Sequence, residues 1–209
     1  MDPMRWAEIV SMIANNYNNY DGFVILHGTD TMGYTSSALS FMLENLTKPV
    51  ILTGSQLPIG ELRTDGKENL MTAIEIASAK NENGRPMVPE VCIFFNGKLI
   101  RGNRAIKINA EGFHAFDSFN YPHLCDVGIN FQYHKHHILT PHYDKPMVPH
   151  LRLDPNVIVF SLFPGIQDNI VRHVLESPDL RGIVMRTFGS GNAPHAPWII
   201  RLLGEAAHR

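Results

Sequence analysis

The sequence has little of several features that would assign a protein to a class at once. It holds only two cysteines among its 209 residues, Cys92 and Cys125, in unrelated contexts. This excludes a disulfide framework and suits a reducing compartment. No apolar run approaches the roughly 20 residues that cross a bilayer, and the opening MDPMRW has no apolar leader segment. We therefore expect a cytoplasmic protein with no membrane partner.

An excess of charge of one sign is also lacking. Lys and Arg number 18 against 20 Asp and Glu, and the formal net charge is -2. The densest basic group, Lys98, Arg101, Arg104 and Lys107, is short, so no nucleic-acid partner is expected. Hydrophobic residues make up 44% of the chain and charged residues 18%, which predicts an ordinary globular protein with a sizeable core.

Short apolar runs alternate with helical apolar stripes along the first half of the chain. The patterns predict helices over 3–16, 35–46 and 66–80, strands over 23–26, 49–53 and 91–96, and a return strand over 98–108. The pair Asn96-Gly97 predicts the hairpin turn between the last two strands. This order is typical of a doubly wound, mostly parallel sheet whose faces are both covered by helices.

The amino-acid composition of the chain changes after residue 130. The stretch 132–155 is rich in His and Pro, and we interpret 140–156 as an interdomain connection with an edge strand. Residues 1–139 then form the first α/β domain. Residues 157–209 hold only two strands and two helices, which is small for a self-sufficient parallel domain. The predicted fold class is α/β, a doubly wound sheet followed by the start of a second, smaller α/β domain.

Candidate chemistry begins at residues 22–32, GFVILHGTDTM, where an apolar strand runs into hydroxyls and a carboxylate. Open α/β sheets bind their ligands at the carboxyl ends of parallel strands. A Thr hydroxyl needs a base, and a lysine can serve only where its pKa falls from about 10.4. Thr29, Asp30 and a lysine suit attack on a carboxamide, but spacing alone does not select Lys107. The alternative is that Thr29 and Asp30 cap the next helix.

Other polar positions carry two interpretations each. Ser55 follows the second strand, either in the same crevice or as a turn residue. Arg63 and Asp65 could bind charge, although Asp65 is more simply a helix cap. The loop 189–194 could present backbone amides to an anion, but it lacks a dinucleotide pattern, so no organic cofactor is expected.

The histidines suggest a metal hypothesis that their spacing does not support. Five of them crowd one stretch: His134, His136, His137, His142 and His150. Their spacing is poor for a rigid tetrahedral site and no nearby cysteine completes one, so no metal is expected. An exposed connector is the favoured interpretation. His27 is interpreted as a packed histidine rather than a catalytic one.

Residues 22–32 strongly resemble the second signature of the bacterial-type L-asparaginases. The similarity covers essentially the whole chain and points to the cytoplasmic type I branch, through residues 40–46, 48–56, 62–70, 94–104 and 188–194. The resemblance implies that Thr29 is the second catalytic threonine and that Asp30 contacts the amino group of the substrate. It also implies that Lys107 completes a Thr–Lys–Asp trio and that the backbone at Ser55 lines the substrate amide.

The implied reaction is hydrolysis of L-asparagine to L-aspartate and ammonia through a threonyl acyl-enzyme, with backbone amides and water holding the oxyanion. The resemblance implies no metal or organic cofactor, and it implies a homo-oligomer, either a dimer or a tetramer. The family's Thr-Gly-Gly-Thr-Ile strand, lid and substrate loop are not found in this sequence, and its second domain continues beyond Arg209.

The chain is therefore expected to be a middle piece of an asparaginase, with an exposed strand edge, a tendency to self-associate and little or no turnover. Two alternatives stay open. One is a non-catalytic remnant that binds a partner. The other is an asparaginase-like subunit of a tRNA-dependent amidotransferase, for which no RNA-binding sequence is visible.

Overall fold

The computed structural model describes residues 1–208, which form two compact units, one over Met1–Arg152 and the other from Leu153 onward. The predicted connection over 140–156 is thus divided between them. Its expected edge strand is present as β10 (Val148–Pro149), which pairs antiparallel with β2 (Leu43–Glu44) and so belongs to the first unit.

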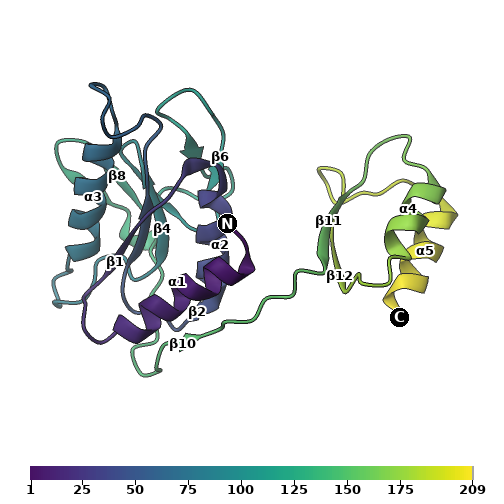
Figure 1. The fold of residues 1–209 in the computed structure, drawn as a ribbon, viewed down its shortest axis with the longest axis horizontal. Coiled ribbons are helices and arrows are strands. Elements are labelled where there is room, and N and C mark those ends of the chain that lie inside the picture. Colours follow the sequence, from purple (N-terminus) through teal and green to yellow (C-terminus); the bar gives the residue numbers. More distant parts are fainter. Residues whose placement is uncertain (209) are drawn as a thin grey trace. The chain divides into compact units, whose positions relative to one another are not determined.

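A six-stranded sheet organises the first unit (Figure 1). Its spatial order is β1 (Phe23–Leu26), β3 (Val50–Thr53), β4 (Val91–Phe95), β5 (Lys98–Arg101), β8 (Cys125–Val127) and β9 (Phe131–Tyr133). β1, β3 and β4 run parallel, and each later strand is antiparallel to its neighbour. The direction changes at the predicted hairpin, where Asn96 has φ 47° and Gly97 has φ 76°. Positive φ at both central positions suits a tight two-residue turn.

Alternate residues of the central strands pack against helices on opposite faces of the sheet. Val50 is buried with α1 (Pro3–Asn16) and α2 (Thr29–Met42), whereas Ile51 is buried with α3 (Gly66–Ser78). Figure 1 shows α3 on one side of the sheet and α2 on the other. The continuous apolar character of the strands follows from this two-sided burial.

Helix α1 matches its prediction, because its signals are local. The Asp2 carboxylate accepts the backbone N–H of Arg5 at 2.9 Å, and a proline opens the first turn. Helix α2 begins at Thr29 rather than at residue 35, after Gly28 in an extended conformation. The apolar stripe could not reveal the first turn of α2, because polar residues that face the site occupy it.

The predicted return strand over 98–108 is two strands, β5 and β6 (Ile106–Lys107). The chain turns at Gly102, which packs so closely that a Cβ there would lie 2.8 Å from the Val91 carbonyl oxygen. β6 pairs antiparallel with β7 (Phe116–Asp117) in a separate two-stranded sheet. A short 3-10 helix, Lys135–His137, follows β9.

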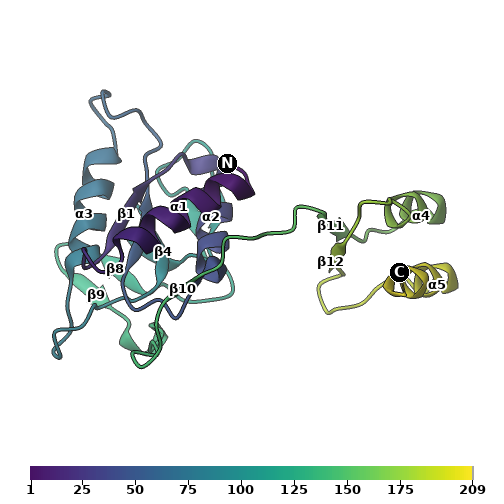
Figure 2. The same ribbon diagram turned by 60° about the horizontal axis from the view of Figure 1, so that its bottom comes forward.

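The second unit has the two strands and two helices that were predicted. β11 (Val157–Ser161) and β12 (Gly182–Arg186) run parallel, and α4 (Asp168–Leu175) and α5 (Pro197–Ala207) lie side by side (Figure 2). Along the described chain, no helix combines the length and apolar character needed to cross a membrane. Cys92 and Cys125 are both buried and unpaired in the part of the chain that the structure describes.

Candidate functional site

Two neighbouring parallel strands bring their carboxyl ends to the same edge of the sheet. Leu26 at the end of β1 lies opposite Thr53 at the end of β3, and the His27 N–H donates to the Thr53 carbonyl at 2.8 Å. The next residue, Gly54, passes close to His27. A Cβ at position 54 would lie 2.2 Å from the His27 carbonyl oxygen, so a glycine is needed for this approach. The turns after β1 and β3 therefore emerge together.

The Lys107 ammonium joins the first turn of α2 to strand β6. Its Nζ donates to Thr29 Oγ1 at 2.9 Å and to Asp30 Oδ1 at 2.6 Å. The Lys107 side chain is 19% exposed and that of Asp30 is 92% exposed. The structure thus brings together the three residues of the expected trio, and places them at the carboxyl edge where α/β sheets bind ligands.

The capping interpretation of Thr29 and Asp30 is wrong. The N-cap position of α2 is Gly28, and no side chain caps this helix. The Asp30 carboxylate accepts from Lys107 instead, and this hydrogen bond, together with the charge of Lys107, lowers the pKa of Asp30. Asp30 therefore stays ionised and holds the amine in place beside the Thr29 hydroxyl.

A chain of hydrogen bonds that no sequence pattern indicated fixes the turn before Thr29 to α1. Trp6 Nε1 donates to Thr35 Oγ1 at 3.0 Å, Thr35 Oγ1 lies 2.8 Å from His27 Nε2, and His27 Nδ1 lies 2.7 Å from the Gly28 carbonyl oxygen. A carbonyl only accepts, so Nδ1 carries the proton and Nε2 accepts from the Thr35 hydroxyl. Every contact is satisfied by a neutral His27.

Ser55 lies after β3, packed against the start of α3, where a Cβ on Gly66 would be 3.2 Å from Ser55 Cβ. Within residues 1–208 no hydrogen bond joins the Ser55 side chain to Thr29, Asp30 or Lys107. A backbone contribution of Ser55 to substrate binding stays a prediction.

Asp65 occupies the N-cap position of α3, as expected, but its side chain makes no capping hydrogen bond. Its carboxylate accepts the backbone N–H groups of Gln56, at 3.0 and 3.1 Å, and of Leu57, at 3.2 Å. A carboxylate after a loop resembles a cap in sequence, because both roles use the same residue type next to a helix. The bonds of Asp65 instead hold the chain in place directly after Ser55.

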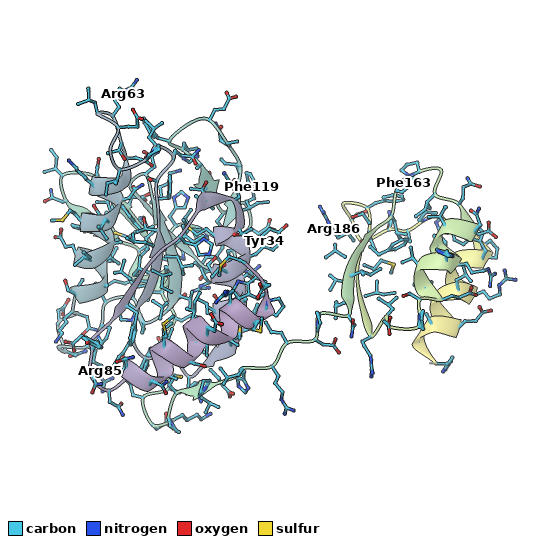
Figure 3. The ribbon with its side chains drawn as sticks, viewed as in Figure 1. Tyr34, Arg63, Arg85, Phe119, Phe163 and Arg186 are labelled. Carbon is cyan, nitrogen blue, oxygen red and sulfur yellow. The ribbon has the colours of Figure 1, made fainter. Side chains whose placement is uncertain are left out.

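Gln56 ties this segment to the loop that follows Lys107. Its Nε2 donates to the carbonyl oxygens of Ala110, at 3.1 Å, and Gly112, at 3.0 Å. Figure 3 shows Arg63 at the tip of the loop between β3 and α3, and its guanidinium lies 6.0 Å from the Phe113 ring centre. The sequence offered no signal for Gln56, since a glutamine in a loop has no distinctive pattern.

Two of the crowded histidines bind different acidic side chains, so they do not converge on one site. His134 bonds Asp126 at 2.7 Å, whereas His150 bonds Glu44 at 2.6 Å. Across residues 1–208, no three His, Cys, Asp or Glu side chains are arranged to hold a metal ion. In the loop 189–194, the Phe188 N–H donates to the Asn192 carbonyl at 2.9 Å, which closes the loop on itself.

The α/β sheet thus gathers a hydroxyl, an amine and a carboxylate at its parallel carboxyl edge, the usual place of a ligand-binding or catalytic site in this fold class. Comparison with known proteins identifies the family, because the family model Asparaginase, N-terminal matches residues 1–139. The chain belongs to the asparaginase family.

Individual relatives agree with this assignment. L-asparaginase 1 of Escherichia coli K12 is 44% identical over 209 residues, which is 100% of this chain and 60% of the relative. The 60 kDa lysophospholipase of Mus musculus is 44% identical over 205 residues, 98% of this chain and 35% of that protein. The crystal structure of L-asparaginase I from Vibrio cholerae superposes with a TM-score of 0.90 at 43% identity, covering 100% of this chain and 61% of that one. The chain thus spans about three fifths of the two asparaginases.

Proposed function

We propose that this protein hydrolyses L-asparagine to L-aspartate and ammonia, using Thr29, Lys107 and Asp30. The observation that supports the proposal most directly is the position of Lys107 Nζ, 2.9 Å from Thr29 Oγ1 and 2.6 Å from Asp30 Oδ1. This contact occurs at a ligand-binding edge of an asparaginase-family sheet.

The chemistry follows from what each group can donate or accept. Lys107, after losing a proton, accepts the hydroxyl proton of Thr29, and the Thr29 oxygen attacks the carboxamide carbon. The C–N bond breaks, the proton passes from Lys107 to the leaving nitrogen, and ammonia departs. Water then cleaves the ester and restores Thr29. In this scheme backbone amides, with that of Ser55 as the candidate, and a water molecule hold the oxyanion.

Asp30 has two roles in this scheme. Its carboxylate holds Lys107 beside Thr29, and its 92% exposure leaves oxygen lone pairs free for the substrate's ammonium group. The scheme uses no metal and no organic cofactor. We further propose that the protein acts in the cytoplasm, as its two buried free thiols suggest, and that it forms a homo-oligomer, a dimer or tetramer.

The proposal is tested by ammonia release from L-asparagine with the purified chain, its folding checked by circular dichroism. We expect weak release that Thr29→Ala and Lys107→Gln each abolish. Lys67→Gln is the matched control, because Lys67 is an exposed lysine of α3 that makes no hydrogen bond or ion pair to Thr29, Asp30 or Lys107 within residues 1–208. Release that persists in Thr29→Ala would overturn the assignment of Thr29.

Parallel reactions separate the alternatives. L-glutamine tests the amide specificity, and a lysophospholipid tests the activity named for the mouse relative. Glutamyl-tRNA supplied with ATP and an amidotransferase partner subunit, which activates the glutamyl carboxyl group, tests ammonia delivery. A folded chain that turns over none of these substrates would favour the non-catalytic alternative. Light scattering of the same sample measures the oligomeric state.

A further inference from the structure

The hairpin that carries Lys107 lies outside the six-stranded sheet. Its strands β6 and β7 pair only with each other, Ile106 opposite Asp117 and Lys107 opposite Phe116. On one face Phe116 is buried, with its ring centre 5.2 Å from that of Phe95. The ladder itself does not join Lys107 to the six-stranded sheet, so side chains make the attachment of the hairpin to the sheet.

Asp117 provides that attachment on the second face. Its Oδ1 accepts from His123 Nε2 at 2.8 Å and from the Ser118 N–H at 2.8 Å. Its Oδ2 lies 3.4 Å from His114 Nε2 and 3.9 Å from Lys98 Nζ. The hydrogen bond from His123 is the main cause that lowers the pKa of Asp117 to about 2, so this carboxylate is ionised at neutral pH.

His123 continues the attachment into the six-stranded sheet. Its second nitrogen, Nδ1, lies 3.3 Å from Asp126 Oδ1 on β8, and Asp126 Oδ2 bonds His134 Nε2 at 2.7 Å. His134 follows β9, the strand that pairs with β8. The His123 side chain is 20% exposed. One imidazole therefore joins a carboxylate of the Lys107 hairpin to a carboxylate of the sheet.

This bridge depends on the protonation of His123. A neutral imidazole has one N–H donor, which the hydrogen bond to Asp117 uses, and the 3.3 Å contact with Asp126 is an ion pair only when His123 also carries its second proton. Loss of one proton removes one of the two attachments. Several other titratable or charged groups surround this bridge. His114 and Lys98 contact Asp117, and His134 contacts Asp126. The cavity of about 340 Å³ that contains His123, Asp117 and Asp126 is also lined by His137 and Tyr121.

We propose that His123 is a positioning residue for Lys107. By bridging Asp117 and Asp126 it holds the β6–β7 hairpin against the sheet and keeps Lys107 Nζ directed at Thr29 and Asp30. Its effect on turnover rests on the function proposed above, but its effect on the position of Lys107 does not. The bridge weakens when His123 loses its second proton, which makes the alignment of Lys107 dependent on pH.

The position of Lys107 is measured without catalysis through Asp30, whose carboxyl pKa is lowered by Lys107. Carboxyl NMR should show the Asp30 titration moving upward, toward its ordinary range, in His123→Gln. Amide exchange at Lys107 and Phe116 should quicken about tenfold, as expected for a loosened local unit. Ile51 and Ile93 in the central strands should keep their protection. His173→Gln, an exposed histidine of α4, is the matched control.

Two further measurements cover the outcomes that the variant alone leaves open. If His123→Gln does not fold, the pH dependence of Lys107 amide exchange in the unaltered chain still tests the bridge. The protection of the Lys107 amide, after correction for the pH dependence of intrinsic exchange, should fall as His123 loses its second proton. If ammonia release is measurable, the variant should lower kcat about tenfold with a smaller change in KM. The proposal is overturned if His123→Gln folds and leaves the Asp30 titration and the Lys107 amide exchange unchanged. If the parent chain is inactive but His123→Gln shows these NMR changes, only the hydrolase function is rejected.

Discussion

The backbone at Gly54 passes His27 so closely that a Cβ at position 54 would lie 2.2 Å from the His27 carbonyl oxygen. This approach fixes the spacing between the turns that follow β1 and β3. By contrast, Gly28, inside the signature itself, has open space where a Cβ would stand. The glycine that the geometry requires is thus not the one nearest to Thr29.

Gly54→Ala should destabilise the first unit by about 2 kcal/mol or more, because backbone atoms must move to relieve the overlap. Gly28→Ala is the matched control and should cost about 1 kcal/mol or less, the usual loss when alanine replaces glycine at an N-cap. Urea unfolding of both variants measures the difference. Equal losses would show that the contact at His27 does not govern stability here.

Asp117 should make the stability of the fold depend on acid pH. Its pKa lies at about 2 in the folded protein against 3.8 ordinarily, chiefly because His123 donates to it. The contribution is complete above the unfolded pKa and is lost as pH falls through the folded one. We expect about 1–2 kcal/mol, reduced for partial exposure, to disappear over this range.

Asp117→Asn lacks this titration, so its free energy of unfolding should fall less than that of the parent between about pH 4 and about pH 2. Urea titrations at several pH values in this window give the slopes. Identical slopes for parent and variant would assign the acid sensitivity to other carboxylates.

Removing one partner of the buried ion pair between Glu90 and Arg101 should lower the free energy of unfolding more than removing both. Glu90 Oε2 accepts from Arg101 Nε at 2.6 Å, and the two side chains are 3% and 11% exposed. Glu90→Leu leaves the Arg101 charge without its partner and should cost about 3–5 kcal/mol. The double variant Glu90→Leu with Arg101→Met should cost less than that single change. Thermal and urea unfolding compare them, and a double variant that is worse than the single one contradicts the argument.

Thr35→Val should loosen the turn that holds Thr29. The change preserves shape but removes the hydroxyl that links Trp6 Nε1 to His27 Nε2. Two polar groups lose their partner, and each one left unsatisfied costs about 1–3 kcal/mol where buried. Thr72→Val, on the half-buried side of α3, controls for the lower helix propensity of valine.

The nitrogen shifts of His27 report the same change spectroscopically. The parent chain should show the Nδ1–H form of a neutral imidazole, because Nδ1 faces the Gly28 carbonyl. Thr35→Val should expose Nε2 to water and shift its resonance. An unchanged His27 spectrum would show that the hydroxyl is not its partner in solution.

Much of the fold was predictable from sequence because its signals are local. The cap and apolar stripe of α1, the apolar runs of β1 and β3, and the Asn96-Gly97 turn each lie within a few residues of the structure they specify. The pattern failed at α2, whose first turn begins with polar residues. It was incomplete at Asp65, whose carboxylate binds loop N–H groups and the Asn69 side chain rather than backbone N–H groups of α3.

The sequence by itself determined the parallel strands, the helices on both faces and the presence of a hydroxyl and a carboxylate at a strand end. Spacing left Lys107 as one of several lysines and the family resemblance indicated it, but only the tertiary structure brings it to Thr29, across a separation of 78 residues. Periodicity and turn chemistry act over a few residues, whereas this contact depends on where Gly102 turns the chain and where the β6–β7 hairpin packs. The bridge from Asp117 through His123 to Asp126 likewise exists only after the hairpin and sheet have folded together.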